Sequence, residues 1–315
     1  MNLSEQYLLF YEEYNRKINL VKENLDDFRK KKNKALKKGI FASDAEVAKL
    51  EKKLFGIEKD VEINEYEEDE YVKEKKEKLV ENEDLADAMM ILEDEDNSRK
   101  MAEKNDMIQI YRFENGDMFI GALEGDELTG VGSYIFSTND DENKGVINTE
   151  YIGDFSNGKR EGAGIFTFSN GNEYIGFFSN NKSNGVGRMK YNNGDEYIGN
   201  WINGKKNGIG IYTWDDGSIY TGKFSNGKMD GDGLFFNARA ELIYKGEWKR
   251  GLIHGYGKYM WAKDKWYEGE FQQGQKHGEG KFYLNNDLVY EGTWKFDKPV
   301  IFDKTFEDLL DCLVD

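Results

Sequence analysis

The chain has 315 residues, of which 38% are hydrophobic and 14% aromatic, enough to build a folded core. Its 61 acidic residues outnumber its 44 basic ones, and the formal net charge is -17. Binding to nucleic acid or to anionic lipid by charge alone needs a basic face, so this balance disfavours both functions. A mean hydropathy of -0.81 with 33% charged residues favours an elongated repeat over one compact globule.

Residues 4–38 are predicted to form a long helix, because apolar and aromatic residues recur at alternating steps of four and three. This spacing is typical of a coiled-coil seam, which would pack on a partner helix. Gly39 follows a lysine-rich last turn and is a natural residue to end the helix. The seam consists of Tyr7, Tyr11, Tyr14, Ile18, Val21, Leu25 and Phe28.

A second helix over about residues 44–62 is predicted from a capping box, in which Ser43 is followed three residues later by Glu46. The short connection favours an antiparallel helical hairpin, with pairing to a helix of another protein as the alternative. Residues 58–70 and 81–96 are rich in acidic side chains, with apolar residues 89–92 inside the second stretch. This part fits a solvated linker or, alternatively, an acidic recognition arm that anchors in a partner groove.

An internal repeat of about 23 residues dominates residues 106–297. Each unit contains Tyr-x-Gly-x-Phe/Trp, and this period of two places the three residues on one face of a strand. The missing glycine side chain leaves a slot for an aromatic ring from a neighbouring strand. The seven copies are Tyr151, Gly153, Phe155; Tyr174, Gly176, Phe178; Tyr197, Gly199, Trp201; Tyr220, Gly222, Phe224; Tyr244, Gly246, Trp248; Tyr267, Gly269, Phe271; and Tyr290, Gly292, Trp294.

The second half of each unit adds Gly-x-Gly-x-aromatic, and Asn-Gly pairs such as Asn203-Gly204 mark tight turns between the two halves. Each unit is therefore predicted to be one β-hairpin. A single hairpin cannot bury an aromatic face in water, so the units must stack into a continuous antiparallel ribbon. Asn181 replaces one turn glycine, and residues 137–150 form a polar insertion that we expect to project as a loop.

The pattern Tyr-x-Gly-x-Trp-x-x-Gly-Lys-x-x-Gly-x-Gly, almost whole in residues 197–210, resembles the MORN repeat (membrane occupation and recognition nexus). The resemblance is clean over residues 151–294, and a weaker copy precedes it at residues 119–136. It implies a mainly β fold, an elongated antiparallel hairpin ribbon. MORN-rich proteins are frequent in axonemal radial spokes and other cytoskeletal assemblies, and some relatives form homodimers through terminal repeats.

Three regions are expected: a charged helical arm (1–105), the repeat array (106–297) and a short amphipathic carboxyl-terminal helix (298–315). The tail places Phe306, Leu309, Leu310 and Leu313 at helical spacing after Thr305. That helix would close the last sheet edge or, alternatively, dock on another protein.

No catalytic, cofactor-binding or metal-binding set is evident. Recurring Gly-Lys pairs lack the Ser or Thr of a phosphate-binding loop, and neither His254 nor His277 has a second ligand at metal spacing. The single cysteine, Cys312, excludes an internal disulfide framework. We therefore expect a non-enzymatic scaffold without cofactors, one that binds other proteins of a large assembly, with homodimerisation left open.

The alternative is a peripheral phospholipid-binding or membrane–cytoskeleton tether that uses Lys205, Lys206 and Lys228. The amino end lacks the basic and apolar pattern of a secretory signal. A cytoplasmic, cytoskeletal location is expected, and a ciliary axoneme is favoured by the family resemblance.

Overall fold

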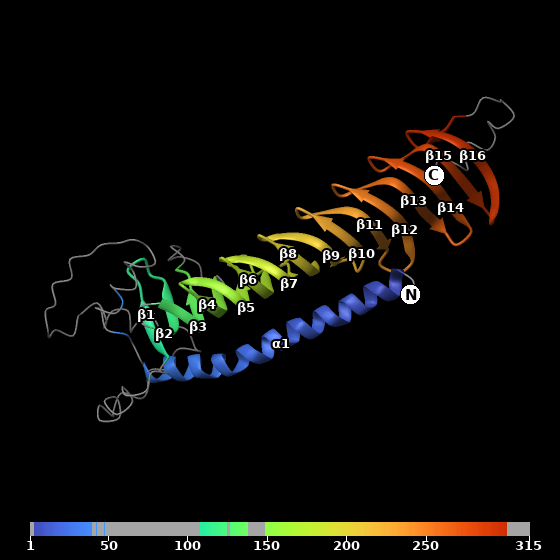
Figure 1. Cartoon of the computed structure of the whole chain (residues 1–315). Coiled ribbons are helices and arrows are strands. Elements are labelled where there is room, and N and C mark those ends of the chain that lie inside the picture. Colours follow the sequence, from blue (N-terminus) through green and yellow to red (C-terminus); the bar gives the residue numbers. More distant parts are fainter. Residues whose placement is uncertain are drawn as a thin grey trace, which may run out of the picture. The chain divides into compact units, whose positions relative to one another are not determined.

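The structure, a computed structural model, describes residues 3–39, 42, 47, 108–124, 127–137 and 149–300 (Figure 1). These residues form the helix α1 and strands β1–β17, so the predicted mainly β hairpin array with an amino-terminal helix is confirmed. The predicted second helix and the insertion lie almost wholly outside the described residues. Of the predicted carboxyl-terminal helix (298–315) only residues 298–300 are described, and Lys298–Pro299 form strand β17 instead of a helix. The chain divides into two compact units: residues 17–182, here the amino-terminal unit, and residues 1–16 with 183–315, here the carboxyl-terminal unit.

Helix α1 (Leu3–Lys38) agrees with the predicted span and ends at Gly39, whose φ of 61° is the left-handed conformation expected after a helix. Its residues 17–38 belong to the amino-terminal unit. There each strand pairs antiparallel with the next one in the sequence. The strands are β1 (Gln109–Arg112), β2 (Met118–Glu124), β3 (Glu127–Ile135), β4 (Glu150–Ser156), β5 (Lys159–Thr167) and β6 (Glu173–Ser179).

The carboxyl-terminal unit repeats the same arrangement, and its strands again pair with their sequence neighbours. They are β7 (Lys182–Lys190), β8 (Glu196–Ile202), β9 (Lys205–Thr213), β10 (Ile219–Ser225), β11 (Lys228–Phe236), β12 (Leu242–Lys249), β13 (Leu252–Ala262), β14 (Lys265–Gln272), β15 (Gln275–Leu284), β16 (Asp287–Lys295) and β17 (Lys298–Pro299).

Two-residue turns close the hairpins within the repeats. Asn203 and Gly204 have φ of 50° and 81°, and both values are positive, as in the type I′ turn that Asn-Gly favours. Asn181, which replaces the turn glycine, adopts φ of 67° and keeps the same turn. Asparagine tolerates this conformation better than most residues, so the departure from the repeat pattern leaves the sheet intact, as predicted.

One side of the sheet, here called the core face, carries the tyrosines, glycines and aromatic residues of the repeat. In the carboxyl-terminal unit the glycines stand opposite one another from strand to strand, as Gly199, Gly210 and Gly222 do. A Cβ at Gly199 would lie 2.5 Å from Tyr197 Oη and 2.6 Å from Gly210 Cα. The glycines opposite one another on successive strands therefore form a channel, which the tyrosine rings fill.

The first glycine of each Gly-x-Gly has a different function. Gly208 and Gly278 have φ of 64° and 63°, in the left-handed region that glycine adopts without the steric cost of a Cβ. They lie where the register shifts in the hairpin, between Gly199 and Trp201 in one repeat and between Gly269 and Phe271 in another. A slot for an aromatic ring is the predicted reason for the glycines of Tyr-x-Gly, whereas backbone conformation is the reason at Gly208 and Gly278.

Candidate binding surfaces

The repeat-defining residues form the core of the array. Tyr151, Tyr197, Tyr220, Tyr244 and Tyr267 are completely buried, whereas Tyr290 in the last repeat is half-buried. Each tyrosine hydroxyl donates to the backbone carbonyl three residues on, as Tyr197 does to Asn200 at 3.0 Å and Tyr267 to Glu270 at 2.9 Å. Burial raises the hydroxyl pKa, for example at Tyr244, and so keeps the donor protonated.

Each buried tyrosine also connects two repeats through its ring. Tyr220 meets Phe224 of its own repeat at 5.2 Å between ring centroids and Trp248 of the next repeat at 5.1 Å, both edge-to-face. Tyr197 and Tyr267 make the same pair of contacts. These side chains hold neighbouring hairpins together, so the core face is filled by contacts within the array.

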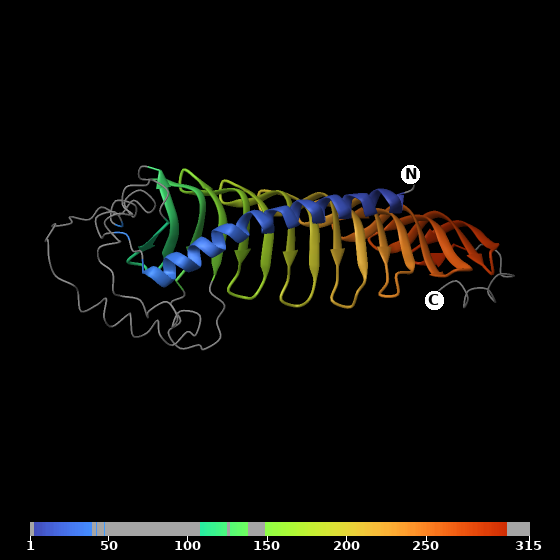
Figure 2. The same cartoon turned by 90° about the horizontal axis from the view of Figure 1, so that it is seen from below.

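The side of the sheet opposite the core face, here called the second face, carries the residues that alternate with the core residues. In the amino-terminal unit it includes Ile120, Ile152, Ile165 and Ile175, all buried. α1 runs across the strands on this side (Figure 2). Lys32 of the helix joins it to the sheet by an ion pair of 2.6 Å with Glu150.

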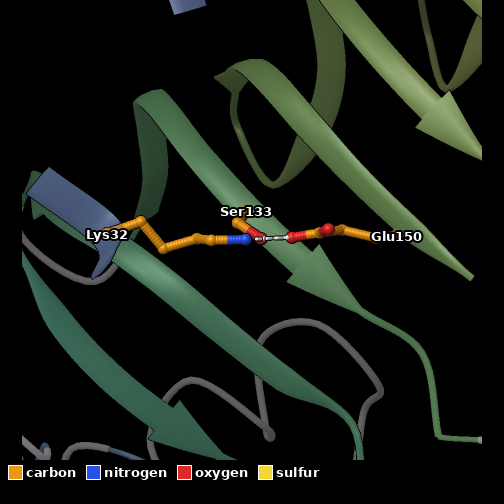
Figure 3. Close-up of polar contacts among 3 residues, drawn as sticks. All are labelled: Lys32, Ser133 and Glu150. Atoms are coloured by element: carbon orange, nitrogen blue, oxygen red, sulfur yellow. Dashed lines mark hydrogen bonds and ion pairs between the residues drawn. The ribbon is translucent and has the colours of Figure 1, made fainter. Parts of the chain in front are cut away.

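The ion pair is part of a small polar cluster, in which Ser133 Oγ donates to the same Glu150 oxygen at 2.5 Å (Figure 3). Ser133 is fully buried, and the Lys32 and Glu150 side chains are only 13% and 23% exposed. A charge pair this sheltered is screened less by solvent than a surface pair. The cluster therefore fixes where the helix lies along the strands of this unit.

In the carboxyl-terminal unit the second face is again covered where α1 reaches it. Tyr14 of the helix accepts a hydrogen bond of 3.0 Å from Asn200 on β8, and Ile198, Thr221 and Leu234 nearby are at most 5% exposed. We call the second face of β8–β11 the covered face. Thr221 Oγ1 is buried there without a hydrogen-bond partner among the described residues.

The predicted seam lies on the sheet side of α1. Tyr14, Ile18, Val21, Leu25 and Phe28 are buried within this chain, and Lys32, one turn beyond Phe28, contacts Glu150 on the sheet. The seam was predicted as a surface for a partner helix, whereas the helix contacts found beside it go to the chain's own strands. A flat sheet face accepts the same stripe of apolar residues as a second helix, so the spacing alone does not distinguish them. Tyr7 and Tyr11 lie in α1, but their side chains are outside the described part of the chain.

Beyond β11 the side chains of the second face are exposed or half-buried, and most of them are aromatic or charged. We define the open face as Lys245, Tyr256, Lys258, Trp266, Glu268, Lys281, Tyr283 and Glu291, on β12–β16. None of these side chains is buried, and Tyr256 is 54% exposed. Trp266 and Tyr283 stack at 4.6 Å with an interplanar angle of 13°, and Lys258 Nζ lies 4.2 Å from the Trp266 ring centre. The open face thus combines flat aromatic rings with charged groups.

Lysines on the core face are less available. Lys206 lies 4.4 Å from the ring centre of Tyr212, and Lys276 is 4% exposed between Trp261 and Trp294. Burial lowers the pKa of both lysines, partly offset by Asp195 and Asp297 respectively. Lys206 therefore packs against rings, unlike Lys205 and Lys228, which are exposed at the hairpin turns.

The residues that the structure describes contain no group of three or more His, Cys, Asp or Glu side chains arranged to hold a metal ion. They also contain no helix that is both long and apolar enough to cross a membrane.

Sequence reasoning missed the open face, although the sequence carries its signal. The residue between tyrosine and glycine is isoleucine at 152, 175 and 198 and threonine at 221, but Lys245, Glu268 and Glu291 in the last three repeats. The strands with Gly-x-Gly change in the same way, from Leu234 to Lys258 and Lys281. At these positions the covered face of β8–β11 carries apolar residues and Thr221, whereas the open face carries charged residues.

The sequence profile described as MORN repeat matches this chain seven times, over residues 151–173, 174–196, 197–219, 220–236, 244–264, 267–289 and 290–300. The β2–β3 hairpin before these matches has the same packing, with Phe119 in the place of the tyrosine. No curated protein sequence matches the chain.

Among solved structures, a similarity was found to the TCP domain of SAS-4 (dCPAP) from Drosophila melanogaster, in complex with a proline-rich motif of Ana2 (dSTIL). The sequences are 12% identical, and the match covers 43% of this chain and 69% of that one. With a TM-score of 0.28, it has no bearing on the fold or the function of this chain.

Proposed function

This chain is a MORN-repeat protein, with seven repeats between residues 151 and 300, and from that premise we propose that it is a non-catalytic scaffold that binds partner proteins in a large cytoskeletal assembly. MORN repeats are a structural repeat of protein- or lipid-binding scaffolds and not a catalytic fold. The finer assignment, a component of a ciliary axoneme similar to a radial spoke, is supported by the frequency of MORN-rich proteins in such assemblies.

The observation that carries the proposal is the open face. It has exposed and half-buried aromatic rings, Tyr256, Trp266 and Tyr283, on strands whose core face is already filled. Aromatic residues on an otherwise polar surface are typical of protein–protein contacts. Rigid strands hold them in place, which limits the entropy lost on binding.

Affinity purification of the tagged full-length chain from a ciliated cell tests the proposal. Axonemal proteins should co-purify with it, and the chain should remain with the cytoskeleton when soluble proteins are extracted. An isolated monomer that co-purifies with nothing from the cytoskeletal fraction would overturn both the scaffold function and the location.

Lipid binding remains the second candidate, because Lys205 and Lys228 are exposed at the turns of two successive hairpins in the carboxyl-terminal unit. The test is flotation with vesicles that contain phosphoinositides. Flotation of the wild type, abolished in the double variant Lys205→Glu/Lys228→Glu, would establish this candidate. If the chain stays at the bottom of the gradient at low salt, the candidate is excluded.

A further inference from the structure

We propose that the open face is the docking site for an α-helix of a partner protein, and that this helix places an acidic side chain over Lys245 and Lys258. The proposal rests on the proposed scaffold function and specifies its partner. It is carried by three features of the carboxyl-terminal unit: the continuity of the open face with the covered face, an unbalanced lysine pair, and the position of the aromatic rings.

The first feature is continuity. The second face of β8–β11 already holds a helix of this chain, through the hydrogen bond between Tyr14 and Asn200. The same face continues onto β12, since Leu234 on β11 stands opposite Lys245 in the strand register. In both views of the structure, α1 does not extend across β14–β16 of this unit (Figures 1 and 2). A second helix can therefore lie on the same type of surface without displacing the first.

The second feature is charge. The row across the open face alternates in sign over Lys258, Glu268, Lys281 and Glu291, and the last two form an ion pair of 2.9 Å. Lys245 breaks the alternation, because it stands directly opposite Lys258. Like charges in directly opposite positions of a sheet repel, and neither lysine pairs with a carboxylate among the described residues. An acidic group of a ligand would relieve that repulsion.

The carboxylates near the pair are already engaged. Glu247 accepts a hydrogen bond of 3.1 Å from the backbone N–H of Tyr256, and Glu279 accepts one of 2.7 Å from Thr293. These carboxylates keep their charge, so the positive charge offered to a partner is local to the facing lysines Lys245 and Lys258, with Glu268 on the far side of Lys258. A second copy of α1 fits poorly, because that helix has ten basic and six acidic residues.

The third feature is spacing. Lys245 lies on β12, and Trp266 of the Trp266–Tyr283 stack lies two strands further on, on β14. Strands about 4.8 Å apart put roughly 10 Å between these two strands, which is about the length of seven residues of a helix. The partner helix should thus carry an acidic residue and, about two turns away, an apolar residue on the same side.

Peptide binding to the full-length chain tests this chemistry. The probes are two synthetic helical peptides of equal length, with Leu at one position and either Glu or Lys two turns before it, measured by fluorescence anisotropy. The Glu peptide should bind at least tenfold more tightly than the Lys peptide. The preference should be lost in Lys245→Glu/Lys258→Glu and kept in Lys205→Glu/Lys228→Glu, which changes the net charge equally at exposed turn positions.

Equal binding of the two peptides, absence of binding, or the same loss in both double variants would each overturn the proposal. Circular dichroism of both variants should match the wild type, because all four lysines lie on the surface and are not part of the aromatic core.

A photo-cross-linking amino acid at Tyr256 identifies the occupant in cells, with the same replacement at Ile202, which is 51% exposed at a hairpin turn, as the control. A cross-link from position 256, absent from position 202, to a helical segment with the acidic–apolar spacing supports the proposal. Cross-links to lipid, to a second copy or to another part of this chain overturn it. A further outcome is that the wild type and Lys245→Glu/Lys258→Glu co-purify with the same axonemal proteins. That result would support the scaffold function and overturn the docking site.

Discussion

The β8–β11 and β12–β16 segments are built from the same hairpin but differ on one side. Both fill the glycine channel with buried tyrosines, and both connect repeats by edge-to-face aromatic pairs. On the second face, Ile198, Thr221 and Leu234 lie buried in one segment, whereas Lys245 and Lys258 occupy the equivalent positions in the other. The comparison teaches that the core face holds the repeats together in both segments and that the second face is where the two segments differ.

Substitution of a channel glycine should have the largest effect, and it should be equal in the two segments. A Cβ at Gly199 or Gly269 would lie 2.5–2.6 Å from the Cα of the opposite glycine and from the tyrosine hydroxyl. Gly199→Ala and Gly269→Ala should each lower the free energy of unfolding by about 3–5 kcal/mol in urea titrations. Gly204→Ala is the control, because no atom lies within 4 Å of a Cβ built at this position. Its φ of +81° alone should cost about 1 kcal/mol of strain. A large difference between the first two variants would contradict a shared core.

Exchanging second-face residues should separate the two segments. Thr221 is 5% exposed on the covered face and Lys245 is exposed on the open face, at the same position of the repeat. Thr221→Lys should cost about 2–4 kcal/mol, because it buries a charge without a partner, while Lys245→Thr should change stability by less than about 0.5 kcal/mol. Limited proteolysis should show α1 released in the first variant. Equal effects would mean that the two faces do not differ.

The two ion pairs offer a third comparison. The Lys32–Glu150 pair is sheltered and shares its carboxylate with Ser133, whereas the Lys281–Glu291 side chains are 45% and 56% exposed. Lys32→Met should lower the stability of the amino-terminal unit by about 1–2 kcal/mol, seen as faster hydrogen exchange in α1. Lys281→Met should cost less than about 0.5 kcal/mol. High salt should reduce the cost of Lys281→Met more than that of Lys32→Met. If the two variants lose the same stability at each salt concentration, the two ion pairs do not differ in exposure to solvent.

Removing one tyrosine hydroxyl should have a smaller effect than the substitutions of Gly199, Thr221 or Lys32. Tyr197→Phe keeps the ring but leaves the Asn200 carbonyl without its donor, so a loss of about 1 kcal/mol is expected. At the half-buried Tyr290 the same change should cost less, because water can replace the hydroxyl at the Thr293 carbonyl. Thermal denaturation of the two variants gives the comparison, and an equal loss would argue against a role for burial.

Much of the array could be predicted from the sequence, because its signals are local. The Tyr-x-Gly-x-aromatic spacing, the Asn-Gly turns and the heptad-like stripe of α1 each report backbone conformation within a few residues. The partner of that stripe could not be predicted. An apolar helix face packs as well on a sheet as on a helix, and the contacts of Lys32 with Glu150 and of Tyr14 with Asn200 span 118 and 186 residues.

The positions of the open face were readable in the sequence, but they fall between the residues that define the repeat. The repeat pattern is defined by its tyrosine and glycine positions. The change from Thr221 to Lys245 occurs at the position between them, which the pattern leaves variable. The stacking of Trp266 on Tyr283 depends on the cross-strand register, so it requires the structure.

The bond from each tyrosine hydroxyl to a carbonyl three residues on has a consequence for how such a chain can change in length. The Tyr220 ring contacts Phe224 of its own hairpin and Trp248 of the following one, and its hydroxyl donates to a carbonyl of its own strand. A duplicated segment of about 23 residues would bring with it every group that it needs, and both junctions would present the contacts already in use. Within the carboxyl-terminal unit, the distance between Asn200, which contacts Tyr14 of α1, and the open face could then grow one hairpin at a time while the chemistry at either place stays the same.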